Sequence, residues 1–227
     1  METTIYKGNY KQAAADFMKN RLKYNWNESC AEFHIKVNSW PFDAQDMRRF
    51  GSNCYWNIEL HQSMFQGFFD SIKDGQLENV QLCVTNNYPL EFNLPNEFFK
   101  TAFFQNLAQF SCCVSLPSFD AQDFLTMKAS DICIDSSFFS DEVINQKLCQ
   151  YFNNPLAQEE TSYTFYISPE SDKEALLRKL HIIHTYIDGD YEIIVVKHAS
   201  GVEKKLSYVN DDIEQNPDFH QHKIILE

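Results

Sequence analysis

Strand-like and helix-like segments alternate along most of this chain, and that alternation limits its possible folds more than any other feature. Six runs place apolar residues at every second position, as half-buried strands do, and they recur about 20 to 32 residues apart. The six runs are 32–37, 55–61, 79–85, 110–116, 131–136 and 162–168. Predicted helices lie between them at 63–73, 95–107, 120–128, 140–152 and 171–180. The pattern predicts an α/β fold of irregular leucine-rich-repeat-like strand–helix repeats, although the L-x-x-L-x-L consensus is absent.

An internal repeat supports this interpretation. The residues FDAQD occur at 42–46 and again at 119–123, and each copy follows a strand-like run and a short turn that contains proline. Asp43 and Asp120 suit the N-cap position of a helix, where a carboxylate accepts hydrogen bonds from the first backbone N–H groups. Asp46 and Asp123 would then lie at N3. The two units, 33–60 and 110–135, are therefore predicted to share a strand–helix–strand structure.

The two ends of the chain differ from this repeat pattern. A predicted amphipathic helix at 10–22 suggests that residues 1–30 form an N-terminal helical cap. Asp188-Gly189 is typical of a tight turn between two strand-like runs, and a second turn follows at 199–201. We therefore expect residues 31–227 to form one α/β repeat-like domain that a C-terminal β-meander closes, with 222–227 as a further strand.

Composition excludes several kinds of partner. Hydrophobic residues make up 44% of the chain and charged residues 22%, so it can bury a core. A formal net charge of -13 disfavours nucleic acids and anionic membranes. No run of about 18 apolar residues occurs, so no membrane span is predicted. The seven cysteines are odd in number and form no C-x-x-C, which predicts reduced, buried thiols in a cytoplasmic or nuclear protein.

The sequence carries no recognised catalytic, cofactor or metal motif, so no catalytic, cofactor-binding or metal residues are predicted. His181 with His184, and His220 with His222, are spaced like paired ligands but lack a third. Four acidic residues, Asp188, Asp190, Asp211 and Asp212, are better explained as solvated turn residues. The alternative hypothesis is a thiol-dependent or other hydrolase whose site forms only in the fold. It would use Cys149, which has Lys147 nearby, or Cys113, with one of the histidines.

Residues 119–155 resemble the type 2 F-box-associated domain of nematode F-box proteins. The run DFLTM at 123–127 stands where that family has a phrase like DLLTL, and Ile132 and Ile134 follow as a short strand. SDE at 140–142 and Asn145 match the start of the family's next helix, which here lacks the terminal Trp. The Asp188-Gly189 turn also matches, so the resemblance covers roughly 110–209. A related nematode module, the FTH domain, has a similar alternation of strands and helices and is the alternative family.

The resemblance implies a non-enzymatic protein-recognition module, similar to the substrate-binding part of F-box proteins in cullin-RING ubiquitin ligases. Its partner would be a protein, and the binding residues are unknown. An F-box is a three-helix segment of about forty residues, and the first thirty residues here show one predicted helix and no F-box phrase. We therefore do not expect direct binding of a Skp adaptor.

Overall fold

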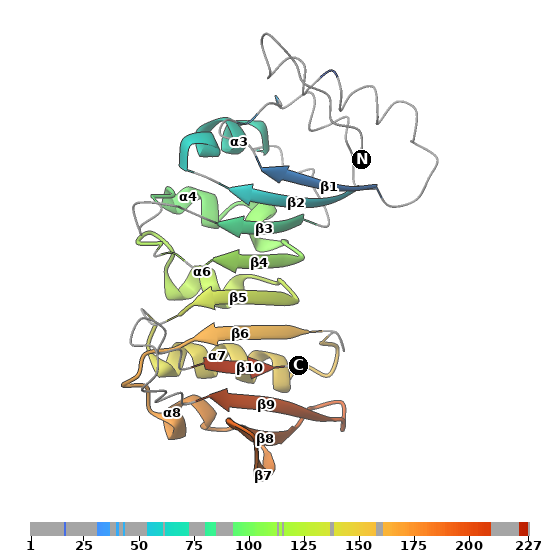
Figure 1. Cartoon of the computed structure of the whole chain (residues 1–227), viewed down its shortest axis with the longest axis vertical. Coiled ribbons are helices and arrows are strands. Elements are labelled where there is room, and N and C mark those ends of the chain that lie inside the picture. The colour runs from blue at the N-terminus through green and yellow to red at the C-terminus, as the bar shows by residue number, and fades with distance from the viewer. Residues whose placement is uncertain are drawn as a thin grey trace.

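The computed structural model describes residues 16, 31–36, 40, 43, 54–60, 62–72, 80–84, 93–112, 114, 116–136, 139–157, 161–209 and 223–226. Within these residues the chain is an α/β protein with ten strands in one sheet (Figure 1). The strands are β1 (Ala31–Lys36), β2 (Cys54–Leu60), β3 (Val80–Val84), β4 (Gln109–Cys112), β5 (Asp131–Asp135), β6 (Ser162–Tyr166), β7 (Ile182–Asp188), β8 (Tyr191–Lys197), β9 (Glu203–Val209) and β10 (Lys223–Leu226). The helices are η1 (Gln62–Met64), α3 (Phe65–Ile72), α4 (Asn96–Phe99), α5 (Ala102–Gln105), α6 (Ala121–Thr126), α7 (Asp141–Phe152) and α8 (Lys173–Leu177).

The six predicted strand runs of the repeat region are confirmed as β1 to β6, and five predicted helices are found between 62 and 177. The segment 95–107 is two short helices instead of one, because Thr101 is extended and caps α5 by accepting a hydrogen bond from the Phe104 amide at 3.1 Å. The N-terminal cap at 1–30 lies outside the described residues except for Asp16. The helix expected after Asp43 also lies outside them, so the first repeat unit stays a prediction in that part.

The sheet has two parts that differ in strand direction. Strands β1 to β6 are parallel and lie side by side in chain order, so each strand–helix–strand connection places the next strand beside the last. Beyond β6 the order is β10, β9, β8 and β7, and every neighbouring pair is antiparallel. The expected meander is present as β7, β8 and β9, and the further strand expected at 222–227 is present as β10. The last strand, β10, lies between β6 and β9.

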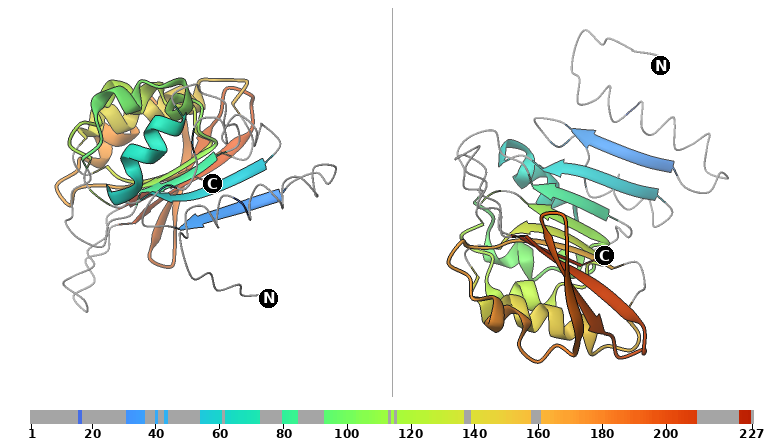
Figure 2. Two further views of the ribbon diagram at one scale, coloured as in Figure 1. Left: turned by 90° about the horizontal axis from the view of Figure 1, so that it is seen from above. Right: turned by 60° about the horizontal axis from the view of Figure 1, so that its bottom comes forward.

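All the described helices lie on one face of the sheet (Figure 2). Between them and the strands runs a chain of phenylalanine rings that contributes much of the hydrophobic core. Phe98, which is fully buried, lies 5.5 Å from Phe104 between ring centroids, and Phe104 lies 5.1 Å from Phe110 on β4. Farther along, Phe124 of α6 lies 5.6 Å from Phe165 on β6. Such ring contacts join successive strand–helix units into one core.

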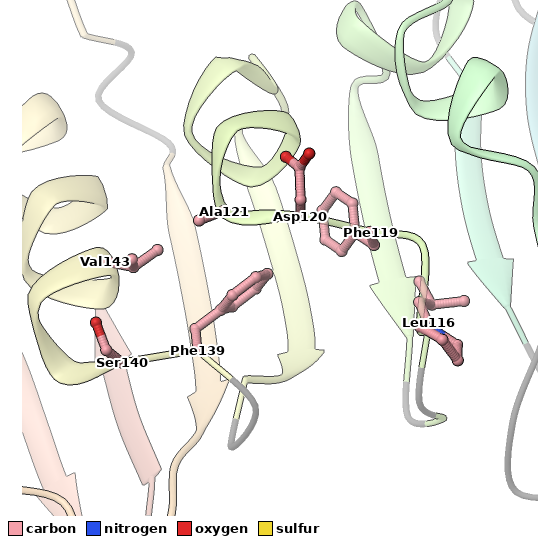
Figure 3. Close-up of a pocket in the computed structure, with 8 residues that line it drawn as sticks. Leu116, Phe119, Asp120, Ala121, Phe139, Ser140 and Val143 are labelled. Atoms are coloured by element: carbon pink, nitrogen blue, oxygen red, sulfur yellow. The ribbon is translucent and has the colours of Figure 1, made fainter.

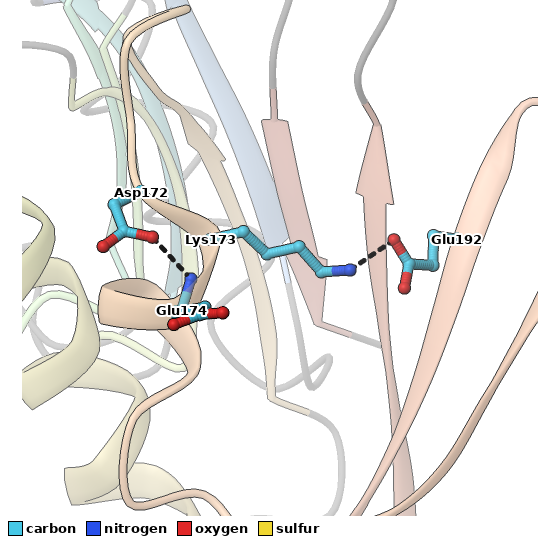
Figure 4. Close-up of polar contacts among 4 residues, drawn as sticks. All are labelled: Asp172, Lys173, Glu174 and Glu192. Carbon is cyan, nitrogen blue, oxygen red and sulfur yellow. Dashed lines mark hydrogen bonds and ion pairs between the residues drawn. The ribbon is translucent and has the colours of Figure 1, made fainter.

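Helix α8 links the helical layer to the antiparallel end of the sheet (Figure 4). The Lys173 amine lies 2.5 Å from a Glu192 carboxylate oxygen on β8 and 5.5 Å from the ring centroid of Tyr208 on β9. Asp172 caps the helix by accepting a hydrogen bond from the Glu174 amide at 2.9 Å. None of the helices that the structure describes is long and apolar enough to cross a membrane.

Candidate functional site

The face of strands β2 to β6 that points away from the described helices carries polar side chains in a regular arrangement. Exposure alternates along each of these strands, with buried residues facing the helices and half-buried residues facing the other way. Parallel sheets are usually covered on both faces. A half-buried polar face on such a sheet is therefore a candidate binding surface.

The strand register aligns these half-buried side chains into rows across the sheet. We call the two rows together the open face. The first row consists of Asn57, Gln81, Gln109, Asp131 and Ser162, and the second consists of Glu59, Cys83, Ser111, Cys133 and Thr164. Neighbouring strands lie about 4.8 Å apart, so each row of five spans roughly 19 Å. That length matches an extended peptide segment or one side of a folded partner.

The charge of the open face is negative. Its ionisable carboxyl groups are Glu59 and Asp131, and Asp135 on β5 continues the same face beside Tyr166 on β6. No lysine or arginine occurs among the open-face residues, in keeping with the net charge of -13. Burial raises the pKa of the Asp131 carboxyl. A cationic group placed beside this carboxylate would favour its charged form, so the face suits a basic partner.

A hollow lies where β4 and β5 end, between the starts of α6 and α7 (Figure 3). Its volume is about 390 Å³, and its apolar lining is supplied mainly by Leu116, Phe119, Phe139 and Val143, with Asp120 and Ser140 at its polar positions. We call this hollow the edge pocket.

The second FDAQD copy builds one wall of the edge pocket. The Asp120 carboxylate accepts a hydrogen bond from the Asp123 amide at 2.8 Å, and the Asp123 carboxylate accepts one from the Asp120 amide at 3.4 Å. This confirms the predicted N-cap as a reciprocal capping box. Burial raises the pKa of Asp123, and the neighbouring Asp120 charge acts in the same direction. Phe119, the residue before this cap, packs against Phe124 of the first turns, with ring centroids 6.3 Å apart.

Three buried polar side chains with structural roles were not predicted from the sequence. Lys147 on α7 is 3% exposed, and its amine donates to the carbonyls of Phe124 at 3.1 Å and Met127 at 2.5 Å. Burial lowers its pKa to about 8. Asn145 donates to the carbonyls of Leu176 and Arg178, and His198 contacts the Tyr151 carbonyl at 3.0 Å. Helical periodicity gave a clue for Lys147, because it shares a face of α7 with Ile144 and Tyr151.

The thiols do not form the arrangement that the hydrolase hypothesis requires. Cys149 contacts the Asn145 side chain and the Arg178 carbonyl, while Lys147 points to the end of α6. Burial raises the pKa of Cys149, which is the opposite of nucleophile activation. Cys113, the other proposed nucleophile, lies outside the described residues. The prediction of buried thiols is correct for Cys112 but wrong for Cys83, Cys133 and Cys149, which are half-buried.

The candidate metal ligands do not come together within the described part of the chain. His181 and His184 are exposed at the start of β7, and the His184 ring stacks 5.9 Å from Tyr186. Asp188 and Asp190 are exposed in the hairpin turn. No group of three or more His, Cys, Asp or Glu among the described residues is placed to hold a metal ion. His220, His222, Asp211 and Asp212 lie outside those residues.

Comparison with known proteins adds no relative, since no family model, no curated protein and no solved structure matches the chain.

Proposed function

We propose that this chain is a non-enzymatic protein-recognition module whose open face binds a protein partner. The observation that carries the proposal is the in-register polar face on β2 to β6, on a parallel sheet whose described helices all lie on the opposite side. Strand–helix repeat proteins of the leucine-rich-repeat type use extended sheet surfaces for binding. The adjacent, sequential parallel strands support an assignment to that irregular repeat class.

The chemistry of the open face favours a partner with lysine or arginine at its contact. Carboxylates at Glu59, Asp131 and Asp135 would accept charge-assisted hydrogen bonds, which are stronger than neutral ones. The amide side chains of Gln81 and Gln109 can donate and accept, so they suit polar groups of the partner between those charges.

The resemblance to type 2 F-box-associated domains supplies a biological setting for this proposal. In that setting the partner is a protein substrate of a cullin-RING ubiquitin ligase, and the chain works in the cytoplasm or nucleus without membrane or nucleic-acid binding. The segment at 140–145 that carries part of the resemblance has a structural role here, because Asn145 ties α7 to the end of α8. The recognition surface is therefore expected on the strands instead of on this segment.

A pull-down with a pair of matched variants tests the proposal. Gln109→Arg places a cation in the middle of the open face, whereas Gln122→Arg makes the same change on the exposed side of α6. The wild type and the Gln122→Arg variant are expected to retain the same partners by mass spectrometry, and Gln109→Arg to lose them. If only Gln122→Arg loses the partners, or if both variants retain them equally, the binding site does not lie on the open face. Co-purification of cullins or Skp adaptors tests the ubiquitin-ligase setting separately.

A further inference from the structure

The strand at the antiparallel end of the sheet is unusually exposed for an edge strand. All seven residues of β7 are exposed, and among the described strands its one sheet neighbour is β8 (Figure 1). Its apolar side chains include Ile187, which is 72% exposed, and Tyr186, which is 38% exposed. Edge strands commonly carry lysine or proline, which block pairing with another chain. Neither occurs in β7, and its one acidic residue is Asp188 at the end.

A short regular segment of β7 is available for pairing. The register with β8 shifts between Ile182 and His184, so the regular part runs from His184 to Asp188. A two-residue turn at Gly189 and Asp190, with Gly189 at φ 60°, joins β7 to β8. In the β7–β8 hairpin, residue pairs that are hydrogen-bonded to each other alternate with pairs that are not, counting from the turn. Thr185 and Ile187 fall in the pairs that are not, so their N–H and C=O groups point away from β8, toward the outer edge of the sheet.

This segment complements itself when it is paired antiparallel about its centre at Tyr186. His184 then lies opposite Asp188 of the second copy, Tyr186 lies opposite Tyr186, and Thr185 lies opposite Ile187. The Tyr186 pair is aromatic, the His184 imidazole can donate a hydrogen bond to the Asp188 carboxylate, and Thr185 and Ile187 are both β-branched residues that suit strands. Parallel pairing would instead place the Asp188 carboxylates of the two copies beside each other. The same surface meets itself, as a two-fold symmetric interface requires.

We propose that two copies of this chain associate through β7, in antiparallel register centred on Tyr186, and join their sheets edge to edge. A large side chain has roughly 150–200 Å² of surface, and each exposed apolar side chain of β7 presents a fraction of that area. Together these side chains supply a few hundred Å² of apolar surface per copy. This is below the roughly 800 Å² per partner of a standard stable interface, so the dimer is expected to be weak and reversible. At physiological salt, charges more than about 8 Å apart are largely screened, which limits the repulsion between two acidic chains.

Sedimentation velocity at increasing concentration and about 150 mM salt tests this proposal. We expect a reversible monomer–dimer equilibrium for the full chain. Ile187→Lys changes an exposed side chain and is expected to raise the dimer dissociation constant at least tenfold. Val202→Lys, a matched change at an exposed apolar residue outside β7, is expected to leave it unchanged. A wild type that stays monomeric at high concentration, or a dimer equally strong in both variants, would overturn the proposal.

A charge exchange separates pairing from any effect on the fold. His184→Glu places carboxylates opposite Asp188 of the second copy, and Asp188→Lys places amines opposite His184. Each variant alone is expected to dimerise at least tenfold more weakly than the wild type. An equimolar mixture is expected to recover dimers, because Glu at 184 of one copy then faces Lys at 188 of the other. Failure of the mixture to recover dimers, or the growth of larger open-ended species, would refute the antiparallel β7 register.

Discussion

Lys147 provides the sharpest test of the packing described above, because burial makes its contribution to stability depend on pH. The amine is 3% exposed and is held by the Phe124 and Met127 carbonyls, and its pKa falls from 10.5 to about 8. Below pH 8 the amine is protonated in both the folded and unfolded states, so the cost of burying the charge is fully present. Between pH 8 and 10.5 the folded state loses its proton first, so the free energy of unfolding rises with pH.

The magnitude follows from the size of this pKa shift. The depressed pKa corresponds to a total of about 3 kcal/mol, since one pKa unit is worth about 1.4 kcal/mol. Between pH 7 and pH 9 the expected gain is about 1.4 kcal/mol for a group that titrates near pH 8. Burial raises the pKa of Cys112 from 9.0 and that of Tyr163 from 10.0 to about 12, so Cys112 begins to lower stability near pH 9 and Tyr163 near pH 10. The contributions of Cys112 and Tyr163 are the same in the wild type and in a Lys147 variant, so they cancel in the difference between the two proteins.

Urea denaturation of the wild type and Lys147→Met at pH 7 and pH 9 measures the effect. Methionine keeps much of the buried stem but removes the titrating amine. The wild type is expected to gain about 1.4 kcal/mol relative to the variant between the two pH values. Lys128→Met, which alters an exposed lysine near the end of α6, is the control, and its difference from the wild type is expected to stay constant. A wild type that gains nothing relative to Lys147→Met would show that the amine is hydrated and that the burial argument is wrong.

Three further predictions concern stability and thiol chemistry. Phe98→Ala is expected to lower the free energy of unfolding by about 3–5 kcal/mol, because Phe98 is fully buried among aromatic rings. The control is Leu156→Ala, at a residue that is 89% exposed, and it is expected to change this free energy by less than about 0.5 kcal/mol. Equal urea midpoints for these two variants would contradict the described core. Asp120→Ala removes the capping box and is expected to cost about 1 kcal/mol in the same assay, and no loss would show that the box contributes nothing. Iodoacetamide at pH 8 is expected to label Cys83 and Cys133 on the open face well before Cys112. The reason is that the Cys112 thiol, with a pKa of about 12, is ionised only to about one part in 10⁴ at this pH. If peptide mass spectrometry finds all three labelled at one rate, the open face is covered.

The strands and helix starts were predictable from the sequence because the interactions that define them are local. Alternating apolar residues identify β4 and β5, and the cap at Asp120 needs only the Asp123 amide three residues away. The Gly189 turn is equally local, since its positive φ favours glycine.

The position of β10 was not predictable in the same way. The pairing of Ile224 with Phe165 on one side and Tyr208 on the other joins residues far apart in the chain. The tight turns predict that β7, β8 and β9 are neighbours, but they do not determine which edge of this hairpin group meets β6. The open face escaped prediction for a related reason, because its rows exist only through the register of five strands.

The ends of the helices show the same contrast between local and distant interactions. The last carbonyls of a helix have no partner within it, and a glycine beyond the end commonly helps to satisfy them. This chain has only six glycines. Instead, buried side chains from other elements reach these carbonyls: Lys147 at the end of α6, Asn145 at the end of α8 and His198 at the end of α7.

These three contacts explain why polar residues are retained inside the helical layer. Each of the three side chains is 7% exposed or less, so an apolar replacement at Lys147 or Asn145 would take a donor away from buried helix-end carbonyls, at a cost of roughly 1–3 kcal/mol per group. Lys147 and Asn145 both lie on α7, so this helix fixes the ends of its two neighbours, α6 and α8. His198, which follows β8, in turn fixes α7 to the antiparallel end of the sheet. The parallel strands and the C-terminal strands are therefore joined through the polar contacts of one helix as well as through the sheet.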